Sequence, residues 1–166
     1  MQKWVTTWGN AEAPSEQREQ VYAKNLTLRY YIPVMADGSK VRLYFSNKHT
    51  DEKVVISSVT IGKNVEFTID SMDKADKTVD IKKVTFNKKS KCKLAKNATL
   101  YSDEIDYPVK KGEMLSVSLY LKDCANLSTG TCLTGRYSFG NIAEGNCVYE
   151  ESMPLYVSRD TSKNYL

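Results

Sequence analysis

The chain has 166 residues, of which 41% are hydrophobic and 27% charged, and its formal net charge is +4. This composition is too apolar for a disordered chain, and the length suits one domain that folds without help from a metal or a disulfide. No apolar run approaches the roughly 18 residues that a membrane span needs, so we predict no membrane span. We predict a single domain over residues 1–157, followed by a polar tail or linker stub over residues 158–166.

The dominant period of the sequence is two, which is typical of half-buried antiparallel strands. Strands are predicted, in chain order, at residues 26–32, 41–46, 54–61, 65–70 and 115–121. Turn residues separate these runs, at 37–38, 62–64, 87–88, 111–112 and 129–130. Because no window shows a helical period, we predict an all-β fold, an antiparallel two-sheet β-sandwich of jelly-roll type. Its core should include Phe67, Val117 and Leu119.

The basic residues are unevenly placed, with seven lysines between Lys82 and Lys96. Residues 79–81 and 84–86 are out of phase across Lys82 and Lys83, which predicts a bulge or a break there. A basic stripe can mark nucleic-acid binding, but these lysines flank a predicted strand and no arginine stands among them. We therefore predict a solvated hairpin whose lysines discourage aggregation, and no nucleic-acid partner. The alternative is an interaction module whose basic hairpin binds an acidic polymer.

The four cysteines, Cys92, Cys124, Cys132 and Cys147, match no zinc motif, and the chain has one histidine. The last three lie in a segment rich in glycine, serine, threonine and asparagine. This favours at least one disulfide, Cys124–Cys132 first and Cys132–Cys147 next, in a secreted or cell-surface protein. Four reduced cysteines are the alternative. No cofactor is predicted, and whether a calcium ion braces the loops is left open.

Catalytic groups are scarce. His49 is the sole candidate base for a Ser-His-Asp arrangement, and it lies in a predicted polar turn where a solvated histidine is expected. Asp103, Glu104 and Asp106 form an acidic cluster, but on a predicted loop that suits solvated charge. No glycine-rich phosphate loop precedes a helix. We therefore predict no catalytic residue on this chain.

The eleven tyrosines and two tryptophans are more informative, because their faces stack on the C–H patches of sugar rings. Strand alternation sends Arg42, Tyr44 and Ser46 away from the core, and Arg29 and Tyr31 likewise. The predicted ligand-binding residues are therefore Arg29, Tyr31, Arg42, Tyr44, Ser46 and Asn47. Alternatively, loops or a second domain cover this face. Trp4 and Trp8 are predicted as core or interdomain anchors.

Three stretches, taken in order, resemble the N-terminal β-sandwich that precedes the catalytic domain in many secreted bacterial SGNH (GDSL-type) hydrolases. They are residues 4–9, residues 28–29 with 38–47, and residues 84–86 with 102–103, 108–109, 112 and 115–121. The chain departs from that pattern where Lys48 to Asp51 replace the usual glycine after Asn47. The Gly-Asp-Ser and Asp-x-x-His motifs of the catalytic domain are absent.

The resemblance implies a non-catalytic accessory domain of a secreted SGNH-type esterase, whose catalytic domain would follow residue 166. Such a domain would bind a polysaccharide or other glycan, or support its catalytic partner, and we expect it to be a monomer. The rival hypothesis from the enzyme class is a small hydrolase in its own right.

Overall fold

The computed structural model of the chain describes residues 3–9, 12–14, 22–48, 50–66, 76–126, 129–131 and 140–154. Within these ranges the regular elements are all β-strands and every strand pair is antiparallel, which confirms the all-β prediction. The part of the chain described here contains no helix with the length and apolarity to cross a membrane. The strands are β1 (Glu12–Pro14), β2 (Tyr22–Ala23), β3 (Leu26–Pro33), β4 (Gly38–Val41), β5 (Tyr44–Ser46), β6 (Val54–Ile56), β7 (Ser58–Asn64), β8 (Thr78–Lys83), β9 (Cys92–Leu94), β10 (Thr99–Tyr101), β11 (Ile105–Val109), β12 (Met114–Leu121), β13 (Ala125–Asn126), β14 (Thr129–Thr131) and β15 (Gly140–Glu144).

A five-stranded sheet with the order β15-β3-β12-β7-β8 forms one layer of the molecule. Its central strand β12 pairs with β3 along its whole length, and Leu119 lies opposite both Leu28 of β3 and Val59 of β7. The predicted strands at residues 26–32 and 115–121 are confirmed here. Their alternating apolar residues supply one continuous hydrophobic face.

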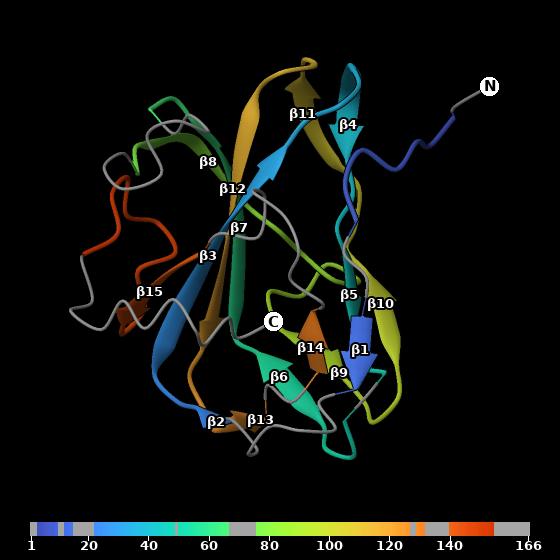
Figure 1. Cartoon of the computed structure of the whole chain (residues 1–166), viewed down its shortest axis with the longest axis vertical. Helices are drawn as coiled ribbons and strands as arrows, with labels where there is room; N and C mark the ends of the chain where they lie inside the picture. The colour runs from blue at the N-terminus through green and yellow to red at the C-terminus, as the bar shows by residue number, and fades with distance from the viewer. Residues whose placement is uncertain are drawn as a thin grey trace.

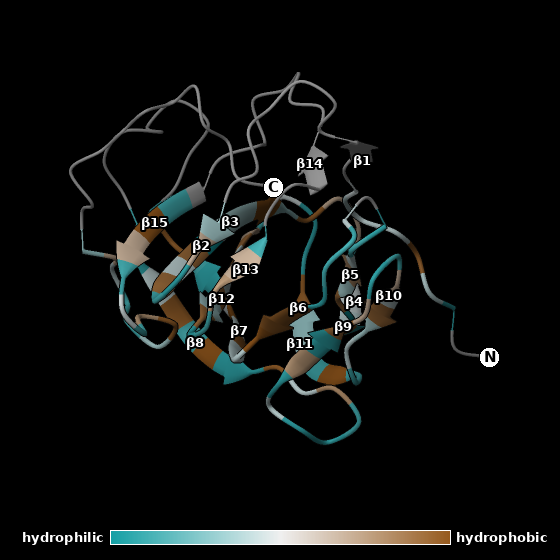
Figure 2. Ribbon diagram, turned by 90° about the horizontal axis from the view of Figure 1, so that it is seen from below, coloured by the Kyte–Doolittle hydropathy of each residue, from teal (hydrophilic) through white to brown (hydrophobic). Residues whose placement is uncertain are grey.

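Three two-stranded pairs, β4–β11, β5–β10 and β6–β9, lie together on the other side of the molecule from this sheet (Figures 1 and 2). The predicted strand at residues 41–46 is divided between β4 and β5, with Arg42 and Leu43 at the break. The facing segment breaks at the same level, between β10 and β11. Ser102 bridges the two breaks, because its N–H donates to the Leu43 carbonyl and its Oγ accepts from the Leu43 N–H.

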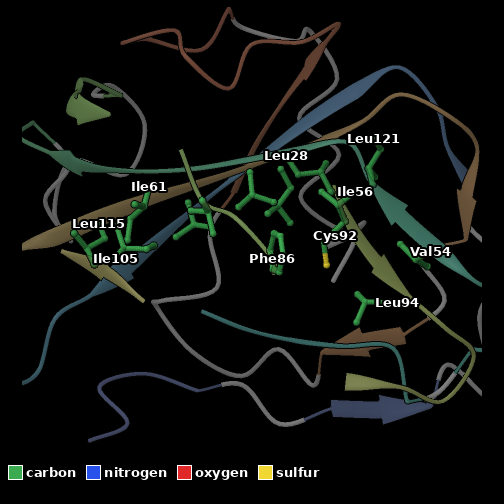
Figure 3. Close-up of a cluster of buried hydrophobic side chains, with 14 of the residues drawn as sticks. Leu28, Val54, Ile56, Ile61, Phe86, Cys92, Leu94, Ile105, Leu115 and Leu121 are labelled. Carbon is green, nitrogen blue, oxygen red and sulfur yellow. The ribbon is translucent and has the colours of Figure 1, made fainter. Parts of the chain in front are cut away.

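The hydrophobic core lies between the five-stranded sheet and these pairs. Figure 3 shows Leu28, Ile61 and Leu115 of the sheet in one cluster with residues from the opposite side. The opposite side contributes Phe86, Cys92, Leu94 and Ile105. Val117 and Leu119 are buried as predicted, whereas Phe67 lies outside the described residues.

Two further predicted strands differ from the structure. Residues 54–61 form two strands, because the chain leaves its partner β9 at Ser57, whose N–H donates to the Tyr120 carbonyl, and then pairs with β12. The predicted turn at residues 62–64 is wrong, since these residues are paired in β7. Val65 follows the end of β7 and is exposed, and residues 67–70 of the predicted strand lie outside the described residues.

The irregularity predicted at Lys82 and Lys83 occurs two residues earlier. Ile61 pairs with Lys82 but Lys63 pairs with Val79, so β8 carries one extra residue. Asp80 within this bulge has a positive φ of 51°. The turn predicted at residues 87–88 is confirmed: Asn87 and Lys88 both have positive φ, between the paired residues Phe86 and Lys89.

Candidate functional site

The structure divides the predicted ligand-binding residues between two separate faces. Arg29 and Tyr31 lie on the face of β3 that points away from the core, as the alternation predicted. That face is covered, however, by residues 145–153, which follow β15 and cross the sheet on the side away from β5 and β10 (Figure 1). Arg29 is 0% exposed and Tyr31 is also buried. The prediction that these two side chains face solvent is therefore wrong.

The guanidinium of Arg29 is fully engaged by hydrogen bonds. It donates to Ser118 Oγ at 2.8 Å, to Asp76 Oδ2 at 2.8 Å and to the Glu150 carbonyl at 2.6 Å. Longer bonds of 3.3 Å reach Thr78 Oγ1 and the Glu151 carbonyl. A buried guanidinium needs such partners, because an uncompensated charge inside a protein costs several kcal/mol. Arg29 thus fastens the covering segment to the sheet.

Other small polar side chains of the sheet fasten the same segment. Thr60 Oγ1 donates to the Val148 carbonyl at 2.7 Å, and Thr27 Oγ1 donates to the Gly145 carbonyl at 2.6 Å. Asp76 accepts a bond of 2.8 Å from the Met153 N–H. The covered face is therefore a buried polar network with a structural role.

The second face carries Arg42 and Tyr44, and here aromatic rings gather. Arg42 Cζ lies 4.3 Å from the centroid of the Tyr101 ring and 4.6 Å from that of Trp4. Tyr44 lies opposite Tyr101 in the β5–β10 pair, and the two ring centroids are 4.8 Å apart. We call these four residues the aromatic platform.

The platform is accessible to solvent. Trp4 is 38% exposed, Tyr44 47% and Tyr101 53%, which is unusual for three large aromatic side chains linked through contacts with Arg42 or with one another. Of the two roles predicted for Trp4, the core anchor is wrong, because its ring lies against Arg42 near the surface, and the interdomain anchor stays a prediction. Tyr101 is not among the residues predicted from the sequence, because only the register of β5 with β10 brings it beside Tyr44.

The last two predicted residues lie at the end of β5. Ser46 is half-buried and points to the same side of the strand as Tyr44. Asn47 is buried, and its Nδ2 donates to the carbonyls of Glu52 at 2.8 Å and Ala95 at 3.0 Å. The predicted ligand contact of Asn47 is thus replaced by a structural role, in which its amide ties two loops together.

The cations near the platform differ in how they are paired. Lys40 forms ion pairs with Glu104 at 3.3 Å and Asp106 at 3.5 Å, and its hydrogen bond to Glu104 and the nearby carboxylates raise the pKa of this lysine. Arg42 forms ring contacts with Trp4 and Tyr101, but neither an ion pair nor a hydrogen bond from its guanidinium to any described residue. Arg42 itself is half-buried.

The basic hairpin is a third surface feature. Its turn is braced by Asp103, which accepts hydrogen bonds from Thr85 Oγ1 at 2.6 Å and from the N–H groups of Lys88 at 2.7 Å and Asn87 at 3.0 Å. These bonds, the one from Thr85 foremost, lower the pKa of Asp103. The exposed lysines around the turn are Lys83, Lys88, Lys89, Lys91 and Lys93.

The described cysteines are free. Cys92 is buried in the core, and burial raises the pKa of its thiol to about 12. Cys124 is exposed and Cys147 is half-buried in the covering segment. The predicted disulfides both require Cys132, which lies outside the described residues, and the other three thiols show no disulfide.

Only some of the candidate catalytic and metal-binding groups lie within the described residues. His49, the candidate base, lies outside them. Among those that are described, no three histidine, cysteine, aspartate or glutamate side chains gather as metal ligands would. The chain matches no protein-family model and no curated protein. Its function is therefore argued from the geometry of the platform.

Proposed function

We propose that this chain is a non-catalytic glycan-binding domain and that the aromatic platform is its binding site. The observation that carries the proposal is the exposure of Trp4, Tyr44 and Tyr101 together, around a guanidinium that has no hydrogen-bond partner among the described residues. Sugar rings present C–H patches that pack on aromatic faces, while their hydroxyls need hydrogen-bonding groups beside those faces. The platform supplies both kinds of contact.

The platform is also held in place before any ligand arrives. Tyr44 and Tyr101 come from two hydrogen-bonded strands, and Ser102 clamps the chain immediately after Tyr101 to Leu43, next to Arg42. A site on paired strands loses little conformational entropy on binding, which favours recognition of flexible oligosaccharides.

The resemblance to accessory domains of SGNH-type hydrolases extends this proposal. In that setting the strands form a jelly-roll-like two-sheet sandwich, the protein is secreted or displayed at the cell surface, and an esterase domain follows in the parent protein. The lone chain should then show no esterase activity on acylated sugars. Measurable turnover by the purified chain would favour the small-hydrolase alternative instead.

The binding proposal is tested by calorimetric titration of the chain with a panel of neutral and acidic oligosaccharides. Tyr44→Ala and Tyr101→Ala should each weaken binding about tenfold or more, since a lost aromatic contact is worth about 1–3 kcal/mol. Tyr149→Ala is the matched control, because Tyr149 is 55% exposed but lies on the covering segment, on the far side of the molecule. Failure of the whole panel to bind, or equal losses in all three variants, would refute the proposal.

A second candidate function is favoured by the basic hairpin, whose five exposed lysines form neither ion pairs nor hydrogen bonds through their ammonium groups with any described residue. Such a cluster suits an acidic polymer bound mainly by charge. Its affinity would fall steeply with salt, whereas stacking on neutral sugars is nearly independent of salt. Binding that Lys88→Gln with Lys91→Gln abolishes, and that Tyr44→Ala leaves intact, would select this function.

A further inference from the structure

We propose that the platform selects glycans that carry carboxylate groups, and that Arg42 is the residue that recognises the carboxylate. The inference rests on the proposed glycan-binding function and names its ligand class. Two features of Arg42 support the inference. Aromatic rings pack against its guanidinium, and this guanidinium has no hydrogen-bond or ion-pair partner among the described residues.

Packing holds the guanidinium of Arg42 in place without occupying its hydrogen-bond donors. Trp4 and Tyr101 contact it through their rings, at centroid distances of 4.6 and 4.3 Å. Ring contacts attract the charge of a guanidinium but supply none of the oxygen acceptors that its N–H groups take. Arg42 is therefore oriented, yet its donors remain open to an acceptor from solution.

The charge of Arg42 is likewise unmatched among the described residues. The two nearby acids, Glu104 and Asp106, form ion pairs with Lys40 instead. Arg29 differs in this respect, because its guanidinium donates hydrogen bonds to Asp76 and to two backbone carbonyls. A stacked arginine without a counterion is the arrangement that a bidentate carboxylate completes.

A uronic-acid residue fits these two features at once. Its ring can pack on the exposed face of Tyr44 or Tyr101, and its carboxylate can accept two parallel N–H bonds from the edge of Arg42. A neutral sugar of the same ring shape would keep the stacking contact and lose the charged pair. Hydrogen bonds to charged groups contribute about 1.5–3 kcal/mol, which corresponds to a preference of about tenfold or more.

The test compares an oligogalacturonide with its methyl ester, because esterification removes the charge and keeps the rings. Calorimetry at fixed ionic strength should show the wild-type chain binding the acid form about tenfold or more tightly. Arg42→Gln should abolish this preference, because it weakens binding of the acid form about tenfold more than binding of the ester. Arg42→Lys should keep only part of it, because an ammonium cannot form the two-pronged contact.

Two controls separate the possible failures. Tyr44→Ala should weaken binding of both forms equally, and Lys88→Gln with Lys91→Gln should leave the preference unchanged. If the wild-type chain binds both forms with equal affinity, the inference fails while the glycan-binding proposal stands. If neither form and no other glycan of the panel binds, the proposed function itself fails. A preference that survives Arg42→Gln but is lost with the lysine substitutions would overturn the inference and assign acid recognition to the hairpin.

Discussion

Arg29 and Arg42 occupy equivalent places in two sequence segments with the same alternating pattern, yet their surroundings in the structure are opposite. Each follows an apolar residue and precedes a strand segment that contains a tyrosine. Arg29 is fully buried with five hydrogen bonds, whereas Arg42 contacts two aromatic rings and its guanidinium has neither a hydrogen bond nor an ion pair with any described residue. One arginine holds the molecule together, and the other is available for recognition.

The difference shows that alternation alone does not decide whether the polar face of a strand is exposed. The face is buried where another segment covers it. On the five-stranded sheet the residues around Arg29 are small: Ser118 lies directly opposite on β12, and Gly62 of β7 lies two residue pairs further along. This leaves space for a long side chain to lie flat and for residues 145–153 to cross above it. Around Arg42 the neighbours are large rings, which hold the side chain near the surface.

The largest expected effect is a difference in the free energy of unfolding between variants of the two arginines. Arg29→Met should lower the free energy of unfolding by about 3–5 kcal/mol, because Asp76 and the Glu150 carbonyl would lose their charged partner inside the protein. Arg42→Met should change it by less than about 1 kcal/mol, because Met keeps the packing against the two exposed rings and only the cation–π contacts are lost. Urea denaturation of both variants measures this, and equal losses would show that the two sites are alike after all.

The second effect tests how closely the covered face is packed. A Cβ at position 62 would lie 2.3 Å from Thr78 Cγ2, and Thr78 cannot easily move because its Oγ1 donates to Ser116 Oγ at 2.8 Å. Gly62→Ala should therefore cost about 1–3 kcal/mol. Gly38→Ala, in β4 of the opposite side, meets atoms no closer than 3.6 Å and should be nearly neutral. Stability of Gly62→Ala equal to that of Gly38→Ala would mean that β7 and β8 are further apart than described.

A smaller effect is the loss of thermal stability at low pH that we expect from protonation of Asp103, which braces the turn of the basic hairpin. The pKa of Asp103 is lowered from its ordinary value of 3.8, so its stabilising contribution is present above that value and is lost as the pH falls through the lowered pKa. Between about pH 5 and pH 2 the melting temperature of the wild-type chain should fall more than that of Asp103→Asn, which has no carboxylate to protonate. Parallel curves would show that the bonds to the 85–88 turn contribute nothing in solution.

Thiol labelling perturbs the protein least and reports directly on the covering segment. Under native conditions iodoacetamide, followed by peptide mass analysis, should modify exposed Cys124 first, Cys147 more slowly and buried Cys92 only on unfolding. Burial also raises the pKa of Cys147, which slows it further. Arg29→Met should accelerate labelling of Cys147 and leave Cys124 unchanged. A Cys147 rate that does not respond would show that Arg29 does not fasten this segment.

The sequence predicted the long strands well because their alternation is strong and local. Residues 26–32 and 115–121 alternate over a full strand length, and both lie in the five-stranded sheet. It predicted poorly where a strand changes partner, as at Ser57, since that change depends on a hydrogen bond to the distant Tyr120. The turn expected at Gly62 failed for a similar reason: this glycine serves the close approach of Thr78 in a neighbouring strand.

Half of the candidate site followed from the sequence. Arg42 and Tyr44 were predicted from alternation, whereas Tyr101 and Trp4 joined them through pairing and packing between segments far apart in the chain. The sequence does contain an indication that Arg29 is buried, although alternation does not reveal it. Ser116 and Ser118 on the polar side of β12 are small hydroxyl residues, which suit a covered polar face better than the lysines and glutamates usual at a solvated one.

By itself, then, the sequence determined the strand period, the antiparallel character of the fold and which side of each strand is apolar, because these depend on residues that are neighbours along the chain. Tertiary structure alone decided which polar face is covered, which arginine has a counterion and which tyrosines meet. The physical reason is that burial and pairing are set by segments separated by up to 122 residues, as in the bond from Arg29 to the Glu151 carbonyl. No local pattern specifies a contact of that range.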